Sequence, residues 1–205
     1  MSNSKYFIYV LSFTIFLLPQ FVFSAQLYLT ASTDTLSVGD TIIVHAYLDT
    51  EGSKLNVVDG TIKVSSFVDE TSLTLSTENS ILTLWPQKPE FQSNKSQISF
   101  VGGAPEDFQS SKAKLFDIVV SPKIVKDIVI NPVIIQGYLG DGKGTLVSIK
   151  TKDVSFHVVP KIEGQRQINE WTEALQQDAL PPKAFYITAG SDASLYDGQQ
   201  FIVFQ

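Results

Sequence analysis

Short runs in which apolar and polar residues alternate dominate the chain between residues 26 and 159. At 60–67, for example, Ile62 and Val64 alternate with threonine, lysine and serine. A period of two places alternate side chains on opposite faces of a β-strand. We therefore expect strands with one buried and one solvated face, at residues 26–32, 40–50, 60–67, 71–76, 80–85, 96–102, 113–121, 127–139, 145–151 and 153–160.

Turns rich in glycine and aspartate separate these runs. Clear examples are VGD at 38–40, EGS at 51–53 and GDGKG at 140–144. Strands at this spacing, without helical periodicity between them, are typical of an antiparallel β-sandwich and not of a parallel α/β fold. We therefore predict an all-β sandwich over residues 26–160.

The stretch ISFVGGAPEDF at 98–108 interrupts a predicted strand. Two adjacent glycines allow a backbone bulge or a positive φ, so we expect the strand to end at Gly102 and Gly103. Pro105 would then fix a loop, and Phe108 would attach that loop to the edge of the sandwich. We favour this structural interpretation over a ligand-binding loop.

The first 25 residues have the pattern of a secretory signal peptide. Lys5 precedes an uncharged apolar run at 6–23, and the small residues Ser24 and Ala25 follow. This order of basic, apolar and small residues is typical of a cleaved leader. The run is also long enough for an uncleaved membrane anchor, but Pro19 and the small residues favour cleavage, after position 24 or 25. The expected location is secreted or at the cell surface.

The pattern changes after the predicted sandwich. Ile168, Trp171 and Leu175 recur at helical spacing in an otherwise polar segment, so residues 161–182 would form either a linker or a short amphipathic helix, ended by two prolines. Residues 183–205 regain strand character, and the sequence stops within an apolar run. We interpret them as the start of a second, truncated β segment.

Composition narrows the possible function classes. Of the 205 residues, 43% are apolar and 18% are charged, as in globular proteins. The formal net charge of −6 offers no basic surface to a nucleic acid. The sequence contains no cysteine, which excludes both a disulfide framework and a thiolate metal site.

No catalytic motif stands out in the sequence. His45 and His157 lie apart in separate strand-like runs, so we expect neither to bind a metal. The GDGKG loop lacks the spaced acidic ligands and terminal glutamate of a calcium-binding loop, and a hairpin turn suits it better. Neither a serine nucleophile elbow nor a phosphate-binding loop is present. We expect no enzyme activity, no metal and no cofactor.

Three parts of the sequence together resemble a cohesin domain. They are LSVGDTIIVHAYLDTEGSKLNVVDGTIKV at 36–64, ILTLWPQKPEF followed by QISFVGGAPEDFQSSKAKLFDIVV at 81–120, and GYLGDGKGTLVSIKTKDVSFHV at 137–158. The resemblance covers residues 27–159. It implies a nine-stranded, antiparallel, jelly-roll-like sandwich of the fold group shared with several carbohydrate-binding modules. The tail at 181–204 resembles the entry to an Ig-like segment.

The resemblance also implies a non-catalytic binding function, because cohesins bind dockerin domains through one sheet face. In this chain that face would use the polar sides of neighbouring strands, at Thr61, Lys63, Ser65, Gln97 and Ser99. These side chains are small or hydrophilic and lack the large anchors of tight interfaces.

Trp85 is the candidate residue for a carbohydrate site. An exposed tryptophan offers a flat apolar platform on which a pyranose ring stacks, whereas a buried one packs in the core. Alternation puts Leu82 and Leu84 on the core face and Trp85 off it, but Pro86 follows at once and allows the strand to bend. Both interpretations of Trp85 stay open.

The sequence therefore predicts an extracytoplasmic binding module that recognises a dockerin-type protein module or a polysaccharide. The alternative is a structural spacer of a cell-surface protein, and a hydrolase accessory or catalytic sandwich is a third class. Nucleic acid is not an expected partner. Contact with a membrane is expected only through an uncleaved N-terminal segment or through an anchor beyond residue 205.

Overall fold

The computed structural model describes residues 25–69, 71–164, 166–172, 187–191 and 200–204. The predicted signal peptide lies outside this part of the chain except for Ala25, and so does most of the second half of the predicted linker. Two compact units are distinguished, Met1–Trp171 and Thr172–Gln205. Within the described residues, no helix has the length and apolar character needed to cross a membrane.

The first unit is built almost entirely from strands. They are β1 (Ala25–Thr30), β2 (Thr35–Ser37), β3 (Ile42–Asp49), β4 (Leu55–Val64), β5 (Leu73–Ser76), β6 (Leu84–Gln92), β7 (Gln97–Phe108), β8 (Ala113–Val120), β9 (Ile128–Leu139), β10 (Leu146–Lys152) and β11 (Val154–Val159). A single turn of 3-10 helix, η1 (Ser93–Lys95), joins β6 to β7.

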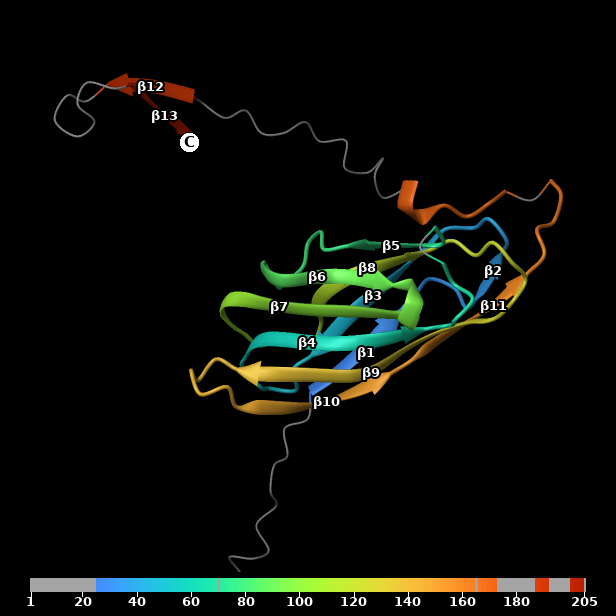
Figure 1. Cartoon of the computed structure of the whole chain (residues 1–205), viewed down its shortest axis with the longest axis horizontal. Helices are drawn as coiled ribbons and strands as arrows, with labels where there is room; N and C mark the ends of the chain where they lie inside the picture. The colour runs from blue at the N-terminus through green and yellow to red at the C-terminus, as the bar shows by residue number, and fades with distance from the viewer. Residues whose placement is uncertain (1–24, 70, 165, 173–186, 192–199, 205) are drawn as a thin grey trace, which may run out of the picture. The chain divides into compact units, whose positions relative to one another are not determined.

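Nine of these strands follow one another in the hydrogen-bonded order β5-β8-β3-β1-β10-β9-β4-β7-β6. The strands β5, β8, β3 and β1 form one layer, and β9, β4, β7 and β6 form the other (Figure 1). Strand β10 connects the layers, because its first half pairs with β9 and its second half with β1. The predicted all-β sandwich is confirmed.

Two of the pairings are parallel, which the sequence did not predict. Strand β1 runs parallel to β10, and β2 runs parallel to β11. Each pair joins segments more than one hundred residues apart in sequence, so no local turn signal could have indicated its direction.

The core lies between the two layers and follows the predicted alternation. Strand β1 buries Ala25, Leu27 and Leu29, and the residues between them face outward. Phe100 of β7 and Phe116 of β8 meet edge to face across the sandwich, with ring centroids 5.0 Å apart. These contacts hold the inner faces of the two layers together. Because side chains alternate along a strand, the residues between the buried ones point out of each layer.

The prediction that a strand ends at Gly102 and Gly103 is wrong. Strand β7 runs through both glycines and through Pro105 to Phe108, which is buried in the core. Neither glycine has a positive φ. The expected bulge exists but lies later, because the register with β4 shifts between Gly103 and Phe108. A bulge leaves residues unpaired, and Pro105 is tolerated there because no ladder hydrogen bond needs its nitrogen.

The strand predicted at 80–85 is also misplaced. Strand β6 begins at Leu84 and continues through Pro86 and Pro89 to Gln92. It lies at the end of the strand order, and its register with β7 shifts twice. An edge strand tolerates proline because one side of its backbone needs no partner, and bulges with prolines protect such an edge from pairing with other chains.

The turn predictions are confirmed where glycine takes a positive φ. Gly39 and Gly52 have φ values of 92° and 88° between successive strands. In the GDGKG segment, Gly142 and Gly144 have φ values of 68° and 71°, and the segment joins the antiparallel strands β9 and β10. Only glycine adopts this backbone region at little cost.

Part of the predicted linker returns to the sandwich. Asn169 forms a bridge with Thr41, the Thr41 amide donates to the Ile168 carbonyl, and the Ile43 amide donates to the Glu170 carboxylate. The backbone is helical at residues 170–172, and the remainder of the predicted helix lies outside the described residues. In the second unit, β12 (Ile187–Ser191) and β13 (Gln200–Phe204) form an antiparallel pair.

Candidate binding face

The outer surface of β6, β7, β4 and β9, called the binding face below, is formed by rows of side chains that cross the strands. Paired residues of neighbouring strands point to the same side of a sheet, so the register defines each row. The rows are Gln92, Gln97, Lys63 and Asn131; Glu90, Ser99, Thr61 and Ile134; Gln87, Val101, Asp59 and Gln136; and Leu84, Gly103, Val57 and Tyr138.

Four of the five predicted partner-binding residues meet on this face. Thr61 pairs directly with Ser99, and Lys63 pairs with Gln97. Ser65 lies beyond the end of β4, where its hydroxyl accepts a hydrogen bond from the Val129 amide at 2.9 Å. The structure thus brings the predicted polar stripe together and ties Ser65 to the start of β9.

A hollow of about 260 Å³ opens at the middle of the binding face. Thr61 and Ser99 line it together with residues that the sequence did not single out, which are Asp59, Gly60, Gln87, Phe100, Val101, Ile134 and Gln136. Ile134 is a large aliphatic side chain of this surface and is 60% exposed, and Leu84 of β6, near the end of the face, is 54% exposed. Asp59 was missed because β4 begins five residues earlier than the predicted strand.

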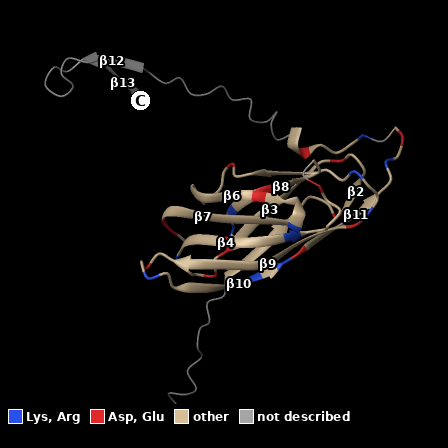
Figure 2. Ribbon diagram, in the orientation of Figure 1, with Lys and Arg blue, Asp and Glu red and all other residues tan. Residues whose placement is uncertain are grey.

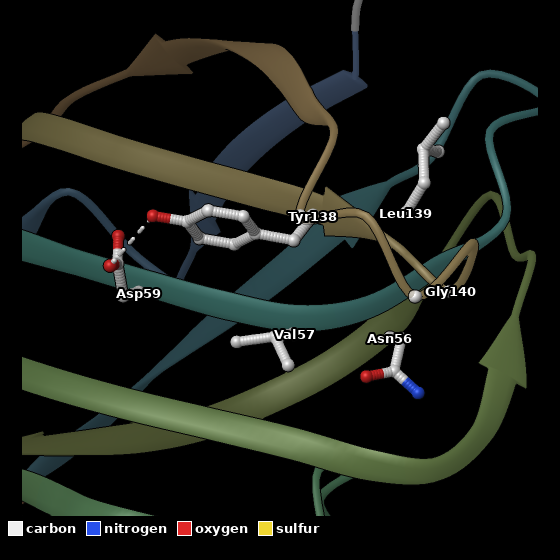
Figure 3. A pocket seen from close by; sticks show the side chains of 8 residues that line it. Asn56, Val57, Asp59, Tyr138, Leu139 and Gly140 are labelled. Atoms are coloured by element: carbon white, nitrogen blue, oxygen red, sulfur yellow. Dashed lines mark hydrogen bonds between the residues drawn. The ribbon is translucent and has the colours of Figure 1, made fainter.

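A larger cleft of about 480 Å³ lies next to the hollow, at the end of the face where β9 turns into β10. Figure 3 shows Asn56, Val57 and Asp59 of β4 on one side, with Tyr138 and the turn at Gly140 on the other. The Asn56 side chain donates to the Ala104 carbonyl at 3.2 Å, which ties the cleft to the bulge of β7. Asp59 lines both the cleft and the hollow.

Tyr138 is the aromatic group of the cleft, and its hydroxyl points at Asp59 (Figure 3). The Tyr138 hydroxyl lies 3.4 Å from both Asp59 Oδ2 and Gln136 Oε1. Desolvation raises the pKa of Tyr138, and the charge of Asp59 and its hydrogen bond raise it further. The tyrosine is therefore a neutral hydrogen-bond donor at physiological pH, held in a defined direction.

The GDGKG turn closes the cleft by its own local hydrogen bonds. Asp141 accepts hydrogen bonds from the Lys143 amide and the Thr145 hydroxyl. The Thr145 bond and then the Lys143 bond hold the pKa of Asp141 below its ordinary value. The exposed Asp107 carboxylate lies directly against Gly140, so a side chain at this position would displace it.

Trp85 lies at the start of β6 and is half-buried. Its ring packs against the core, directly over Gly102 of β7. Leu84, placed on the core face by alternation, is instead 54% exposed. The predicted alternation does not hold here because β6 begins only at Leu84, and Leu82 lies outside the strand. A role for Trp85 in carbohydrate binding stays a prediction.

The two histidines each pair with an aspartate. His45 Nδ1 lies 2.7 Å from Asp117 Oδ1, and His157 Nδ1 lies 2.8 Å from Asp127 Oδ1. Within the described part of the chain, no three histidine, aspartate or glutamate side chains gather as metal ligands would.

Comparison with solved structures identifies the fold. A cohesin module of a family 33 glycoside hydrolase from Clostridium perfringens superposes with a TM-score of 0.54 at 10% identity, over 68% of this chain and 99% of that one. Two cohesins of Clostridium thermocellum, OlpC in complex with Doc435 and OlpA in complex with Doc918, give TM-scores of 0.53 and 0.52. Their identities are 10% and 13%, over 68% and 66% of this chain and 96% and 99% of theirs.

The sandwich therefore has the cohesin fold, and the resemblance seen in the sequence is confirmed at that level. No protein-family model matches the sequence, and comparison with curated proteins finds no match.

Proposed function

We propose that the sandwich is a non-catalytic, extracytoplasmic binding module of the cohesin type, and that its binding face recognises a dockerin-type protein module. The cohesin fold supports this proposal, together with the fact that two of the similar structures are complexes of a cohesin with a dockerin. The observation that carries it is the exposed Ile134 within a polar sheet face that is hollowed on either side of Asp59.

Ile134 supplies the apolar centre that the predicted polar stripe lacked. Protein interfaces combine an apolar core with a polar rim, and a few central residues account for most of the binding energy. Around Ile134, the side chains of Thr61, Ser99 and Gln136 offer hydrogen bonds and no net charge. A helix or loop that places an apolar side chain against Ile134 would thus find a polar rim already in place.

Tyr138 provides a second anchor at the end of the face. Tyrosine is enriched among residues that dominate binding, because it combines a large apolar ring with a hydroxyl. Here the Asp59 carboxylate and the Gln136 amide already orient the hydroxyl. A partner that reaches from the hollow into the cleft would contact Ile134 and Tyr138 together.

Affinity measurements with dockerin modules test the proposal. The protein would be titrated by calorimetry with a panel of dockerins that includes those from the two Clostridium thermocellum complexes. We expect saturable binding to at least one of them. The variant Ile134→Asp should weaken that binding about tenfold or more, as loss of a central contact does.

Ile162→Asp is the matched control for this experiment. Ile162 is 61% exposed, against 60% for Ile134, but it follows β11 and lies outside the binding face. The control should bind like the unmodified protein. Equal losses of affinity in both variants would contradict the proposed face. If the folded protein bound none of the dockerins, the structural-spacer alternative would be favoured.

A further inference from the structure

A second surface, on the opposite layer of the sandwich, carries a row of lysine and tyrosine side chains that the proposed function does not use. Lys152 of β10 pairs with Tyr28 of β1, Tyr28 pairs with Tyr47 of β3, and Tyr47 pairs with Lys114 of β8. Because paired residues share a face, these four side chains form one row across four strands, called the lysine–tyrosine row below.

The two tyrosines at the middle of the row form a preorganised aromatic pair. Their ring centroids lie 5.8 Å apart, with 33° between the ring planes. The Tyr28 hydroxyl donates to the Ser111 carbonyl at 3.3 Å, which fixes the direction of its ring. Both rings are half-buried, so each keeps part of its surface open. Such rings offer contact area at a small cost in side-chain entropy.

Cations surround this aromatic pair. Lys112 places its ammonium 4.8 Å from the centroid of the Tyr47 ring. Lys150 lies one row away from Lys152, on the same face of β10, and both are exposed. Among the described residues, neither of these two lysines is in an ion pair. The β10 lysines are blue in Figure 2. This concentration of cations occurs on a chain whose formal net charge is −6, and therefore points to an anionic ligand.

The neighbouring rows supply hydrogen-bonding groups. Gln26 and Asp49 form a pair on one side of the tyrosines, and Thr30 and His45 form a pair on the other. Asp49 is negatively charged and its charge acts on Tyr28, so sugar hydroxyls and not the anionic groups of a ligand would lie on that side. Among the described residues, none of the large exposed aliphatic side chains belongs to β1, β3 or β8, and the one in β10, Leu146, lies at the opposite end of that strand from Lys152. A protein partner would need such anchors for the apolar core of its interface, whereas a sugar chain needs ring faces and hydrogen bonds.

We propose that the lysine–tyrosine row binds an anionic polysaccharide. A pyranose ring would stack on Tyr28 and Tyr47, and its carboxylate or sulfate groups would pair with Lys150, Lys152 and Lys112. Lys112 would move from the Tyr47 ring to the incoming anion, which is a small change because cation–π contacts at exposed sites are weak. The row lies on the layer opposite the binding face, so both surfaces could be occupied at once.

Retention of the full chain in polysaccharide-containing gels tests this inference. The probes are polygalacturonate, its fully methyl-esterified and thus uncharged form, and poly-L-glutamate, which has the charge but no sugar ring. We expect saturable binding of polygalacturonate that weakens with added salt, with about tenfold weaker binding of either comparison polymer.

Single substitutions then locate the site. Lys152→Ala and Tyr47→Ala should each weaken polygalacturonate binding by about fivefold or more, as loss of one contact does. Lys95→Ala, at an exposed position in η1 beside the other layer, should leave binding unchanged. Because Lys152 is exposed, its variant stays informative even if Tyr47→Ala unfolds the protein.

Three results would overturn the inference. They are no retention of polygalacturonate by the folded chain, equal retention by polygalacturonate and poly-L-glutamate, and equal losses in Lys152→Ala and Lys95→Ala. None of them depends on dockerin binding, so failure of this inference and failure of the proposed function can be told apart.

Discussion

Lys114 Nζ lies 2.7 Å from Asp117 Oδ2, although residues three apart in a regular β-strand point to opposite faces. Strand β8 has one extra residue opposite the step from Ala46 to Tyr47 of β3. This bulge turns Lys114 onto the face that carries Asp117. The second oxygen of Asp117 pairs with His45, so the buried carboxylate has a partner at each oxygen.

Acid should weaken the sandwich partly through Asp117. Burial by itself would raise the pKa of Asp117, but the hydrogen bonds and charges of His45 and Lys114 hold it below its ordinary value. Because the folded pKa is lowered, the stabilising contribution is complete above the unfolded pKa of about 3.9 and is lost as the pH falls through the folded value. Urea unfolding of Asp117→Asn should show a deficit of about 1–3 kcal/mol at pH 7 that shrinks below about pH 4.

Asp127→Asn is the control for this prediction. Asp127 also pairs with a histidine, but the side chains of Asp127 and His157 are 66% and 67% exposed. Exposed ion pairs contribute little, so the change in unfolding free energy should be below about 0.5 kcal/mol at either pH. A deficit for Asp117→Asn that stays constant down to pH 2 would contradict the assigned role of the carboxylate.

Replacement by alanine should lower the stability of the protein at Gly102 but not at Gly103. A Cβ at Gly102 would lie 2.7 Å from the Trp85 ring and 2.8 Å from Leu82, whereas at Gly103 the nearest atoms lie at 3.5 Å. Gly102→Ala must displace Trp85 and should destabilise the protein by about 1–3 kcal/mol, as overpacking does. Gly103→Ala should be tolerated. Thermal unfolding followed by tryptophan fluorescence measures both, and equal midpoints would refute the close packing of Trp85 on Gly102.

Tyr138 should titrate at a lower pH once Asp59 is neutralised. Besides desolvation, the negative charge of Asp59 and its hydrogen bond raise the pKa of Tyr138. Asp59→Asn removes the charge, so the pKa should fall toward the ordinary value. Carbon-13 labelling of the tyrosine rings lets NMR follow each residue. Tyr28 is the internal control, because desolvation, Asp49 and Tyr47 raise its pKa and Asp59 does not; a parallel fall in both would contradict a local effect.

The mature N-terminus should be Ala25. Of the two predicted cleavage points, a cut after Ser24 keeps Ala25, which is fully buried at the start of β1 and pairs with Ile149. A cut after Ala25 would remove a core residue. Mass spectrometry of the protein recovered from the culture medium or cell surface distinguishes the two. A mature form that begins at Gln26, or one that retains residues 1–24, would contradict this prediction.

Local patterns predicted the strands and turns well, because alternation and glycine turns are determined by neighbours in sequence. The turns at Gly39, Gly52 and Gly142 lie where the sequence placed them. The prolines of β6 and the double glycine of β7 misled the prediction for a common reason. Whether a strand tolerates them depends on its place at an edge or bulge of the sheet, and that place is set by distant partners.

The rows across the sheets could not be predicted for the same reason. Ile134, Gln136 and Tyr138 share a parity in the predicted strand at 127–139, but only the register with β4 places Ile134 beside Thr61. Likewise, nothing local indicates that Tyr28 faces Tyr47 or that Lys152 follows in the same row. Sites formed by side chains from several strands can therefore be recognised only once the fold is known.

Above all, we propose that a dockerin-type module binds across β4, β7 and β9. The most direct test is NMR of the isotope-labelled protein titrated with a dockerin that binds it. We expect the amide shifts to concentrate around Asp59, Thr61, Ser99, Ile134 and Tyr138. Shifts concentrated instead on β1, β3 and β8, with the binding face unchanged, would contradict it.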